Sequence, residues 1–289
     1  MKLFEYQDEN CRGRIERFEY TGTEGARKYA LVYLPYGYDA EPTRRYDILY
    51  MMHGGGGSPD AWLDSCPFKN MQDRSIASGE VRPLIVVFPS FYKTKSTRKD
   101  GQIDHDFEHA SVLSFQKELT EQLIPALEGK YRGFAEGTDP EALKKARNHR
   151  GFGGFSMGGV NTWYACYLHI DYFSVFLPLS GDLWLYGEKG GSKKPRETAE
   201  ALRDSAIEKG IGLEDFAVYA ATGSEDIACP NLTPQIEAMK KLDFFRFSED
   251  YSRGNLHYLL AEGYYHEYPA VYQYVYNYLP YLFAKNHEE

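Results

Sequence analysis

The pentapeptide Gly154-Phe155-Ser156-Met157-Gly158 has the pattern G-x-S-x-G. A serine hydroxyl is a weak nucleophile, so it needs a backbone geometry that exposes it and a base that takes its proton. The nucleophile elbow, a sharp strand-to-helix turn, supplies this geometry, and glycines two residues before and after the serine keep side chains out of the turn. The alternative is a plain glycine loop, because Gly and Ser are also loop residues. Ser156 is therefore the first candidate nucleophile, provided that the rest of the chain supplies the context.

An acid and a base stand at two later positions that fit this nucleophile. Asp226 follows an expected strand at 216–221, and His266 follows an expected strand at 256–261. The order nucleophile, acid, base puts each residue just beyond the carboxyl end of a strand, which is where such a triad is carried. The three positions together predict a Ser-His-Asp triad.

Each member of this triad has an ordinary alternative. Asp226 could be a helix N-cap, and Glu225 beside it competes for the acid role. His266 could be a capping or surface histidine, and His257 competes for the base role. His257 falls inside the strand pattern, however, where it could not reach a site above the edge of the sheet.

A glycine run could supply the hydrogen-bond donors that a triad serine also needs, because the tetrahedral intermediate of its reaction carries an oxyanion. His53-Gly-Gly-Gly-Gly57 directly follows a buried apolar run at 47–52. Glycines let a main-chain N–H face the substrate, and each such donor contributes roughly 3 kcal/mol to the transition state. We expect the N–H of Gly55 to be one donor and that of Met157, the residue after the nucleophile, to be the other.

The elements that must position these residues alternate between strands and helices. Residues 14–34 alternate as an antiparallel hairpin does, and 47–52 and 84–88 read as buried parallel strands. The remaining elements are, in order, helices at 112–131 and 139–148, the strand into Ser156, a helix at 160–169, a strand at 173–179, a helix at 196–209, the strand at 216–221, a helix at 232–242, the strand at 256–261 and a helix at 264–285. This alternation predicts an α/β fold with a mostly parallel central sheet and helices on both faces.

These motifs together resemble the esterase D-like α/β-hydrolases. Within that group the chain is most similar to the feruloyl and acetyl xylan esterases of carbohydrate esterase family 1. The resemblance runs from about residue 25 to 285. It is carried by His-Gly-x-Gly-Gly at 53–57, Gly-x-Ser-Met-Gly-Gly at 154–159, Gly-x-x-Asp at 223–226 and the late glycine-rich turn with His266.

The resemblance implies an α/β-hydrolase fold and assigns a role to each motif. The nucleophile falls on Ser156, the acid on Asp226 and the base on His266, with oxyanion donors on Gly55 and Met157. It implies a serine esterase that needs no cofactor and no metal, and whose partner is a small-molecule or oligosaccharide ester.

The substrate is implied less sharply than the chemistry. The resemblance favours a feruloyl or related hydroxycinnamoyl ester of a xylan-derived sugar, with an acetyl ester as the next choice. An S-formylglutathione hydrolase-like esterase, an acyltransferase using the same triad, and a catalytically silent carbohydrate-binding module are the alternatives. A charged segment at about 137–147 and a long loop at 90–110 depart from the common pattern and bear on substrate access.

Composition excludes several other classes of function. The length of 289 residues fits one large α/β domain or two small ones, and we predict a single esterase domain over 1–289. The net charge of −9 argues against a nucleic-acid surface. The four cysteines form no C-x-x-C pair, and no run approaches the ~18 apolar residues of a membrane span. Residues 1–9 turn acidic before any apolar segment, so a cytoplasmic location is expected for the chain as written, and secretion if a leader was removed. No oligomeric state is predicted.

Three further features carry predictions of their own. The cluster of histidines and carboxylates at 104–109 does not read as a helix, and we interpret it as a polar loop rather than a metal site. Trp184 and Tyr186 are candidates for lining a substrate pocket, with simple packing as the alternative. Tyrosines recur every fourth residue from Tyr264 to Tyr276, which is typical of the buried stripe of a helix.

Overall fold

The structure is a computed structural model that describes residues 11–93, 98–99 and 102–284. Its strands are β1 (Arg14–Thr21), β2 (Arg27–Leu34), β3 (Ile48–Met52), β4 (Ile85–Phe88), β7 (Arg150–Phe155), β8 (Val175–Leu179), β9 (Ala217–Gly223) and β10 (Leu256–Ala261), with a small separate pair, β5 (Arg98–Lys99) and β6 (Gln102–Ile103). Its α-helices are α1 (Ala61–Asp64), α2 (Phe68–Ala77), α3 (His105–Glu118), α4 (Ile124–Glu128), α5 (Pro140–Lys145), α6 (Met157–His169), α7 (Gly190–Lys193), α8 (Pro195–Glu208), α9 (Cys229–Met239) and α10 (Tyr268–Tyr278).

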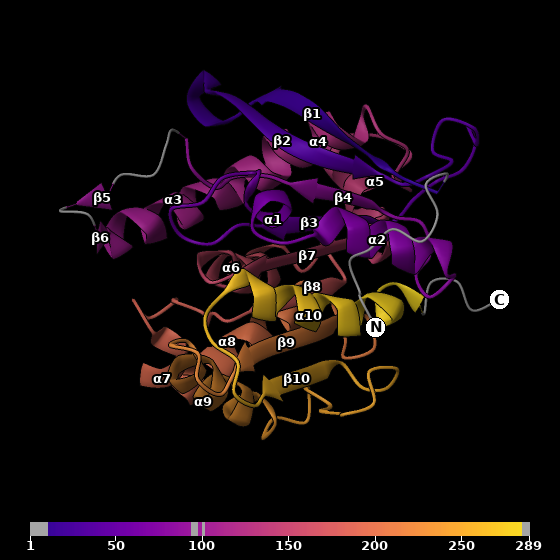
Figure 1. Ribbon diagram of the computed structural model, residues 1–289. Helices are drawn as coiled ribbons and strands as arrows, with labels where there is room; N and C mark the ends of the chain where they lie inside the picture. Colours follow the sequence, from indigo (N-terminus) through magenta and orange to yellow (C-terminus); the bar gives the residue numbers. More distant parts are fainter. Residues whose placement is uncertain (1–10, 94–97, 100–101, 285–289) are drawn as a thin grey trace.

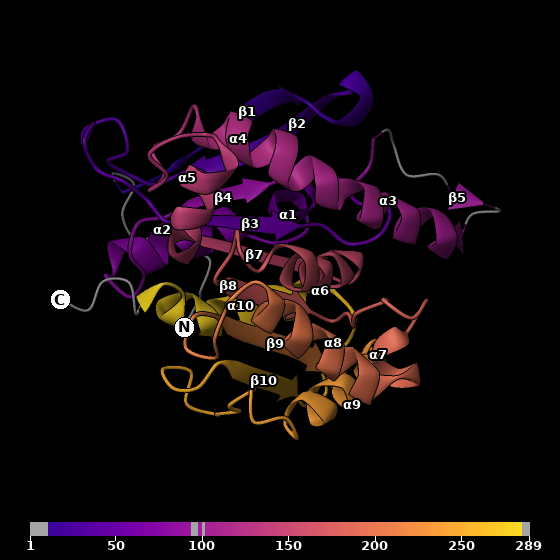
Figure 2. The same ribbon diagram turned by 180° about the vertical axis from the view of Figure 1, so that it is seen from behind.

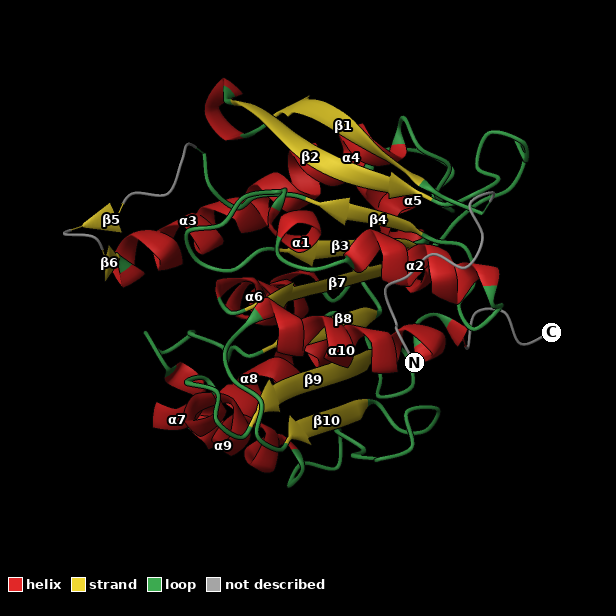
Figure 3. Ribbon diagram, in the orientation of Figure 1, coloured by secondary structure: helices red, strands yellow, loops and turns green. Residues whose placement is uncertain are grey.

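An eight-stranded sheet runs through the molecule in the order β1-β2-β4-β3-β7-β8-β9-β10. The first two strands form the predicted antiparallel hairpin, and β2 joins β4 antiparallel. From β4 to β10 every neighbouring pair is parallel. The arrowheads of β7, β9 and β10 therefore point to the same edge (Figure 3). The predicted α/β class, the parallel sheet and the antiparallel opening are confirmed.

Helices cover both faces of this sheet. Helices α1, α2 and α10 lie on one face (Figure 1), while α3, α4, α6 and α8 lie on the other (Figure 2). The first face is packed by residues such as Trp62 and Tyr274, and the second by residues such as Phe115, Trp163 and Leu202. Burial on both faces explains why β3 and β4 are apolar at every position rather than at alternate ones.

The region at 104–109 is helical, so the prediction of a polar loop there is wrong. Helix α3 begins at His105, and the Asp104 carboxylate caps it by accepting a hydrogen bond from the Phe107 N–H at 3.1 Å. Two acidic residues in the first turn, Asp106 and Glu108, suit the positive end of the helix dipole. The acidic cap was the sequence signal for this helix start.

The predicted single helix at 112–131 is also interrupted. A π-helical turn, Leu119–Leu123, separates α3 from α4. Pro125 follows this turn and has no N–H to donate to the carbonyl one turn earlier, so the regular ladder cannot pass through it. The neighbouring prediction at 139–148 is confirmed as α5, which begins with Asp139 as a cap and Pro140.

The last helix is shorter than predicted. Helix α10 begins at Tyr268, so Tyr264 lies outside it, in the turn after β10. The buried residues of α10 are Ala270, Val271, Tyr274, Val275 and Tyr278 rather than the tyrosines spaced by four. The expected tyrosine stripe is therefore confirmed only in part. Tyr268, Tyr272 and Tyr276 are half-buried and pack against the core, whereas Tyr264 is not part of the helix.

A buried ion pair anchors the strand that leads to Ser156. Arg150, the first residue of β7, is 1% exposed and places two guanidinium nitrogens 2.6 and 2.9 Å from the two carboxylate oxygens of Glu128. It also donates hydrogen bonds to the carbonyls of Leu143 and Tyr172. Such bidentate geometry fixes both partners, so β7 is tied to α4 and α5 at its amino end.

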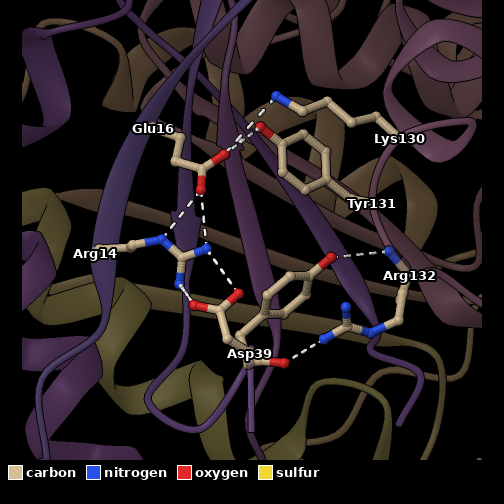
Figure 4. Close-up of polar contacts among 7 residues, drawn as sticks. Arg14, Glu16, Asp39, Lys130, Tyr131 and Arg132 are labelled. Atoms are coloured by element: carbon tan, nitrogen blue, oxygen red, sulfur yellow. Dashed lines mark hydrogen bonds and ion pairs between the residues drawn. The ribbon is translucent and has the colours of Figure 1, made fainter. Parts of the chain in front are cut away.

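Surface contacts tie the hairpin to the rest of the molecule (Figure 4). The Tyr131 hydroxyl donates to Glu16 at 3.0 Å, and Arg14 pairs with Asp39 at 2.8 Å. The Arg132 guanidinium donates to a backbone carbonyl of the loop after β2. The Arg14–Asp39 ion pair is exposed and contributes roughly 0–1 kcal/mol. Together, these contacts position the edge of the sheet far from the candidate site.

Candidate active site

Ser156 lies on the predicted elbow between β7 and α6. Its backbone angles are φ 59° and ψ −117°, a conformation that non-glycine residues rarely adopt. A Cβ at Gly154 would lie 2.6 Å from the Gly158 carbonyl oxygen, and one at Gly158 would lie 2.4 Å from that of Met52. Both glycines of the motif are therefore required by close backbone approach, and the strained turn presents the Ser156 side chain at the carboxyl edge of the sheet.

The structure brings Ser156, His266 and Asp226 together. His266 Nε2 lies 2.9 Å from Ser156 Oγ, and His266 Nδ1 lies 2.7 Å from Asp226 Oδ1. A carboxylate only accepts hydrogen bonds, so it assigns the imidazole hydrogen to Nδ1 and leaves the lone pair of Nε2 for the serine hydroxyl. This is the arrangement in which a serine can lose its proton to a base.

The Asp226 carboxylate is buried and oriented by several donors. Its Oδ1 accepts the N–H of Ala228 at 2.7 Å in addition to the hydrogen from His266. Burial alone would raise the pKa of Asp226. Its hydrogen bond and charge interaction with His266, helped by the Ser180 hydroxyl and the Ala228 N–H, outweigh burial and hold that pKa below the usual value. The carboxylate is thus charged where His266 needs a negative partner.

The glycine loop leaves one main-chain donor unused. The Gly54 N–H donates to the Tyr268 hydroxyl at 3.2 Å, and the Gly56 N–H donates to the Tyr92 hydroxyl at 2.6 Å. Among the described residues, the N–H of Gly55 between them has no acceptor. A Cβ at Gly55 would lie 3.2 Å from the Met157 side chain, so this loop adjoins the elbow.

The N–H of Met157 is the second candidate donor. Met157 is the first residue of α6, where helical N–H groups have no carbonyl one turn earlier. The predicted pair, Gly55 and Met157, therefore consists of two residues that are close in space and whose N–H groups bind no acceptor in the described part of the chain.

The buried His53 side chain stabilises the conformation of the glycine loop. It is fully buried, its Nδ1–H donates to the Gly54 carbonyl at 2.8 Å, and its Nε2 accepts the Ser90 hydroxyl at 2.9 Å. Burial lowers the pKa of His53 to about 4, so the ring is neutral near pH 7 and can both donate and accept. The histidine of the sequence motif thus acts on the loop conformation rather than on a proton in the cavity.

A cavity of about 470 Å³ opens above these residues. Ser156, His266 and the glycine loop line it, together with Ile103, Val160, Trp184, Asn231 and Tyr268. The Trp184 indole is 7% exposed and donates its N–H to Asp182 Oδ1 at 3.1 Å. Burial raises the pKa of Asp182 to about 6, against hydrogen bonds from Gly191 and Trp184 that lower it. The cavity therefore has a largely apolar wall with one buried carboxyl group behind it.

Other candidates from the sequence lie elsewhere. Tyr186 does not line this cavity, because the chain turns back after Trp184 through a hydrogen bond between the Gly187 N–H and the Trp184 carbonyl, and the Tyr186 ring lies 5.0 Å from the Lys194 ammonium. Glu225 is exposed, and His257 is buried in β10 with its Nδ1 2.9 Å from the Ser248 carbonyl. Neither competitor reaches Ser156.

The sequence predicts no functional role for three residues of the site. Asp182 follows β8 and could have been noticed as an acidic residue at a strand end, as Asp226 was. His53 belongs to the glycine motif, which indicates a loop but no role for the histidine ring. The spacing of the tyrosines predicts a core position for Tyr268, and only the true start of α10 shows that it also borders the cavity.

The fold and the site define a class of protein. An elbow serine at the carboxyl edge of a parallel sheet, with its histidine and aspartate from later strand ends, is the arrangement of a serine hydrolase of the α/β-hydrolase class. The sequence matches the esterase family described as "Putative esterase" over residues 23–287, and the chain belongs to this family.

Similar proteins narrow the comparison further. The chain is 40% identical over 272 residues to endo-1,4-beta-xylanase Y of Acetivibrio thermocellus, covering 94% of this chain and 23% of that protein. It is 27% identical over 224 residues to an endo-1,4-beta-xylanase/feruloyl esterase of Xylanibacter ruminicola, covering 76% of this chain and 28% of that protein. The chain thus spans about a quarter of the length of these relatives.

A solved structure with the same fold is a serine-to-alanine mutant of the feruloyl esterase module of Clostridium thermocellum in complex with sinapinate. It is 39% identical to this chain, with a TM-score of 0.86, and the match covers 99% of this chain and 93% of that one. Within the described ranges of our structure, no group of three or more His, Cys, Asp or Glu side chains could hold a metal ion. No described helix is long and apolar enough to cross a membrane.

Proposed function

We propose that this chain is a serine carboxylester hydrolase that cleaves feruloyl and related hydroxycinnamoyl esters of xylan-derived sugars. The observation that carries the proposal is the hydrogen-bonded series Ser156, His266 and Asp226 at the floor of a cavity with an aromatic wall. The substrate class is supported by the similarity to xylanases, one of them bearing a feruloyl esterase name, and to a feruloyl esterase module that binds sinapinate.

In the first half of the reaction, Ser156 Oγ attacks the ester carbonyl carbon while its proton passes to His266 Nε2. The carbonyl oxygen becomes an oxyanion that accepts the N–H groups of Gly55 and Met157, each worth about 10²–10³ in rate. The intermediate then collapses, the bond to the alcohol oxygen breaks, and this oxygen takes the proton from His266. The products are a free sugar and an acyl-enzyme on Ser156.

In the second half, water attacks the acyl-enzyme and gives its proton to His266. The same N–H groups stabilise the second oxyanion, and the hydroxycinnamic acid leaves as Ser156 recovers its proton. Throughout, Asp226 keeps the imidazole hydrogen on Nδ1 and stabilises the imidazolium ion. The flat phenolic ring of such an acyl group suits the wall formed by Trp184, Ile103 and Val160.

The test is hydrolysis of methyl ferulate, acetylated xylan and a nitrophenyl acetate by the wild type and by Ser156→Ala. We expect the wild type to prefer methyl ferulate and the variant to lose activity by about 10⁴-fold or more, as removal of a serine nucleophile does. Ser78→Ala is the matched control, because Ser78 is exposed at the end of α2 and should leave activity unchanged.

Activity that survives in Ser156→Ala would refute the assigned nucleophile. A wild type that cleaves only the nitrophenyl ester would leave the esterase chemistry standing and remove the hydroxycinnamoyl substrate. Preference for acetylated xylan would move the assignment to the acetyl ester.

A further inference from the structure

The cavity has two different walls on either side of Ser156. One wall, from α6 and the loop after β8, contains Val160 and Trp184. The opposite wall contains Ala61 and Ser65 at the two ends of α1, together with Tyr268. The two walls differ in chemistry, because the second one carries two hydroxyl groups. An ester also has two different halves, so each wall can be assigned to one of them.

The position of His266 assigns the alcohol half. His266 Nε2 must hand its proton to the leaving alcohol oxygen, so the alcohol lies against the face of the site on which His266 stands. The His266 ring packs against Phe155 with ring centroids 4.6 Å apart, and the Tyr268 ring packs against the same Phe155 at 4.9 Å. The Tyr268 ring also contacts Trp62 of α1 at 5.2 Å. The wall with Tyr268 is therefore continuous with the histidine that protonates the leaving group.

The hydroxyl group of Tyr268 has a hydrogen that it can donate to a ligand. Its hydroxyl oxygen accepts the Gly54 N–H at 3.2 Å, which fixes the position of the phenol beside the glycine loop. Among the residues that the structure describes, no acceptor takes the hydrogen of this hydroxyl. Burial raises the pKa of Tyr268 to about 12, so the hydrogen is present at any pH at which the reaction would be run. The donor belongs to a residue that lines the cavity.

We propose that Tyr268 donates its phenolic hydrogen to an oxygen of the sugar that forms the alcohol half of the ester, and so makes the enzyme prefer sugar esters over simple alkyl esters. The inference rests on the proposed function and deepens it. The acyl half then lies along Trp184 and the sugar lies between Tyr268 and Ser65 of α1. A methyl ester has no sugar oxygen to accept this bond, so it cannot use the Tyr268 hydrogen.

The experiment compares Tyr268→Phe with the wild type on methyl ferulate and on a feruloylated arabinoxylan oligosaccharide. The readout is the ratio of kcat/KM for the oligosaccharide to kcat/KM for the methyl ester. The substitution also removes the hydroxyl oxygen that accepts the Gly54 N–H. This loss lowers both rates alike and therefore cancels in the ratio. We expect the ratio to fall about threefold to tenfold, which is the usual effect of one neutral hydrogen bond. Tyr36→Phe is the matched control, since Tyr36 is 55% exposed beyond the end of β2, at the opposite edge of the sheet.

A lower ratio in Tyr268→Phe with an unchanged ratio in Tyr36→Phe supports the inference. An unchanged ratio in Tyr268→Phe overturns it, whether or not both absolute rates fall, because Tyr268 then serves only the glycine loop. Hydrolysis of methyl ferulate by the variant shows that it is folded. A wild type without activity on either feruloyl ester overturns the proposed function and the inference with it, so the two failures are distinguishable.

Discussion

Replacing Asp226 by Asn should remove a charge from the site without reversing the histidine tautomer. Oδ1 of Asp226 accepts two N–H groups, from His266 Nδ1 and from Ala228, both at 2.7 Å. Oδ2 is buried and accepts no N–H of any described residue, and the Ser180 hydroxyl that acts on this carboxylate can accept as well as donate. In the variant the amide oxygen must therefore occupy the Oδ1 position, since an amide NH₂ there would face two other donors. His266 keeps its hydrogen on Nδ1 and its lone pair toward Ser156.

The expected loss of activity in Asp226→Asn follows from the missing negative charge alone. A carboxylate at hydrogen-bond distance favours an ionised partner by about one to three pKa units, and each unit corresponds to about 1.4 kcal/mol. The imidazolium ion of the transition state should then lose about 1.4–4 kcal/mol, so kcat/KM should fall about tenfold to a thousandfold. An Asn that reverses the tautomer costs about 10⁴ in kcat, which is a clearly larger effect.

Steady-state kinetics on methyl ferulate with the wild type, Asp226→Asn and Asp226→Ala would measure this difference. The Ala variant leaves both N–H donors without an acceptor and releases the tautomer, so it should be the slower of the two variants. Nitrogen NMR of the His266 ring should place the hydrogen on Nδ1 in the Asn variant, as in the wild type. Equal losses in the two variants, or a hydrogen on Nε2, would refute the reasoning.

Two further predictions concern buried groups around the cavity. His53→Ala removes the N–H that the Gly54 carbonyl accepts and loosens the loop that carries Gly55. The kcat on methyl ferulate should therefore fall about tenfold to a hundredfold, which is less than the loss of a whole oxyanion donor, with little change in KM. An unchanged kcat would contradict this role. The pKa of Asp182 is raised from 3.8 to about 6 in the folded chain, so folding favours its protonated form. The wild type should therefore lose about 2 kcal/mol of unfolding free energy relative to Asp182→Asn as the pH rises from 4 to 7. Urea unfolding at both pH values checks this, and a difference between the two proteins that is independent of pH would count against it.

The fold could be predicted from the sequence because its strands are short, apolar and regularly spaced. Strands β3 and β4 read as uninterrupted apolar runs since the sheet is covered on both faces, and the opening hairpin alternates because its strands are partly exposed. Helix limits were less predictable. The start of α3 depends on an acidic cap that looked like a polar cluster, and the break before α4 depends on Pro125. Local capping and backbone chemistry decided both, and hydrophobic periodicity does not detect either.

The positions of the triad residues were predictable for a topological reason. Parallel strands end at one edge, so Ser156, Asp226 and His266 had to meet there once each was recognised at a strand end. His53 and Ser90 also lie just beyond the carboxyl ends of parallel strands. Their contact requires in addition that β3 pairs with β4, and the spacing in the chain does not specify which strands are neighbours.

Tyr268 illustrates the limit of periodicity most directly. A spacing of four assigns it to the same helix face as Tyr272 and Tyr276, and a helix that began at Tyr264 would bury all of them alike. Because α10 begins at Tyr268, this residue has a turn rather than a helix before it, and its side chain borders the cavity as well as the core residues Trp62 and Phe155. The turn before it must place His266 over Ser156, so α10 cannot start earlier without displacing the base. The requirement that positions His266 therefore also leaves a phenol beside the leaving group.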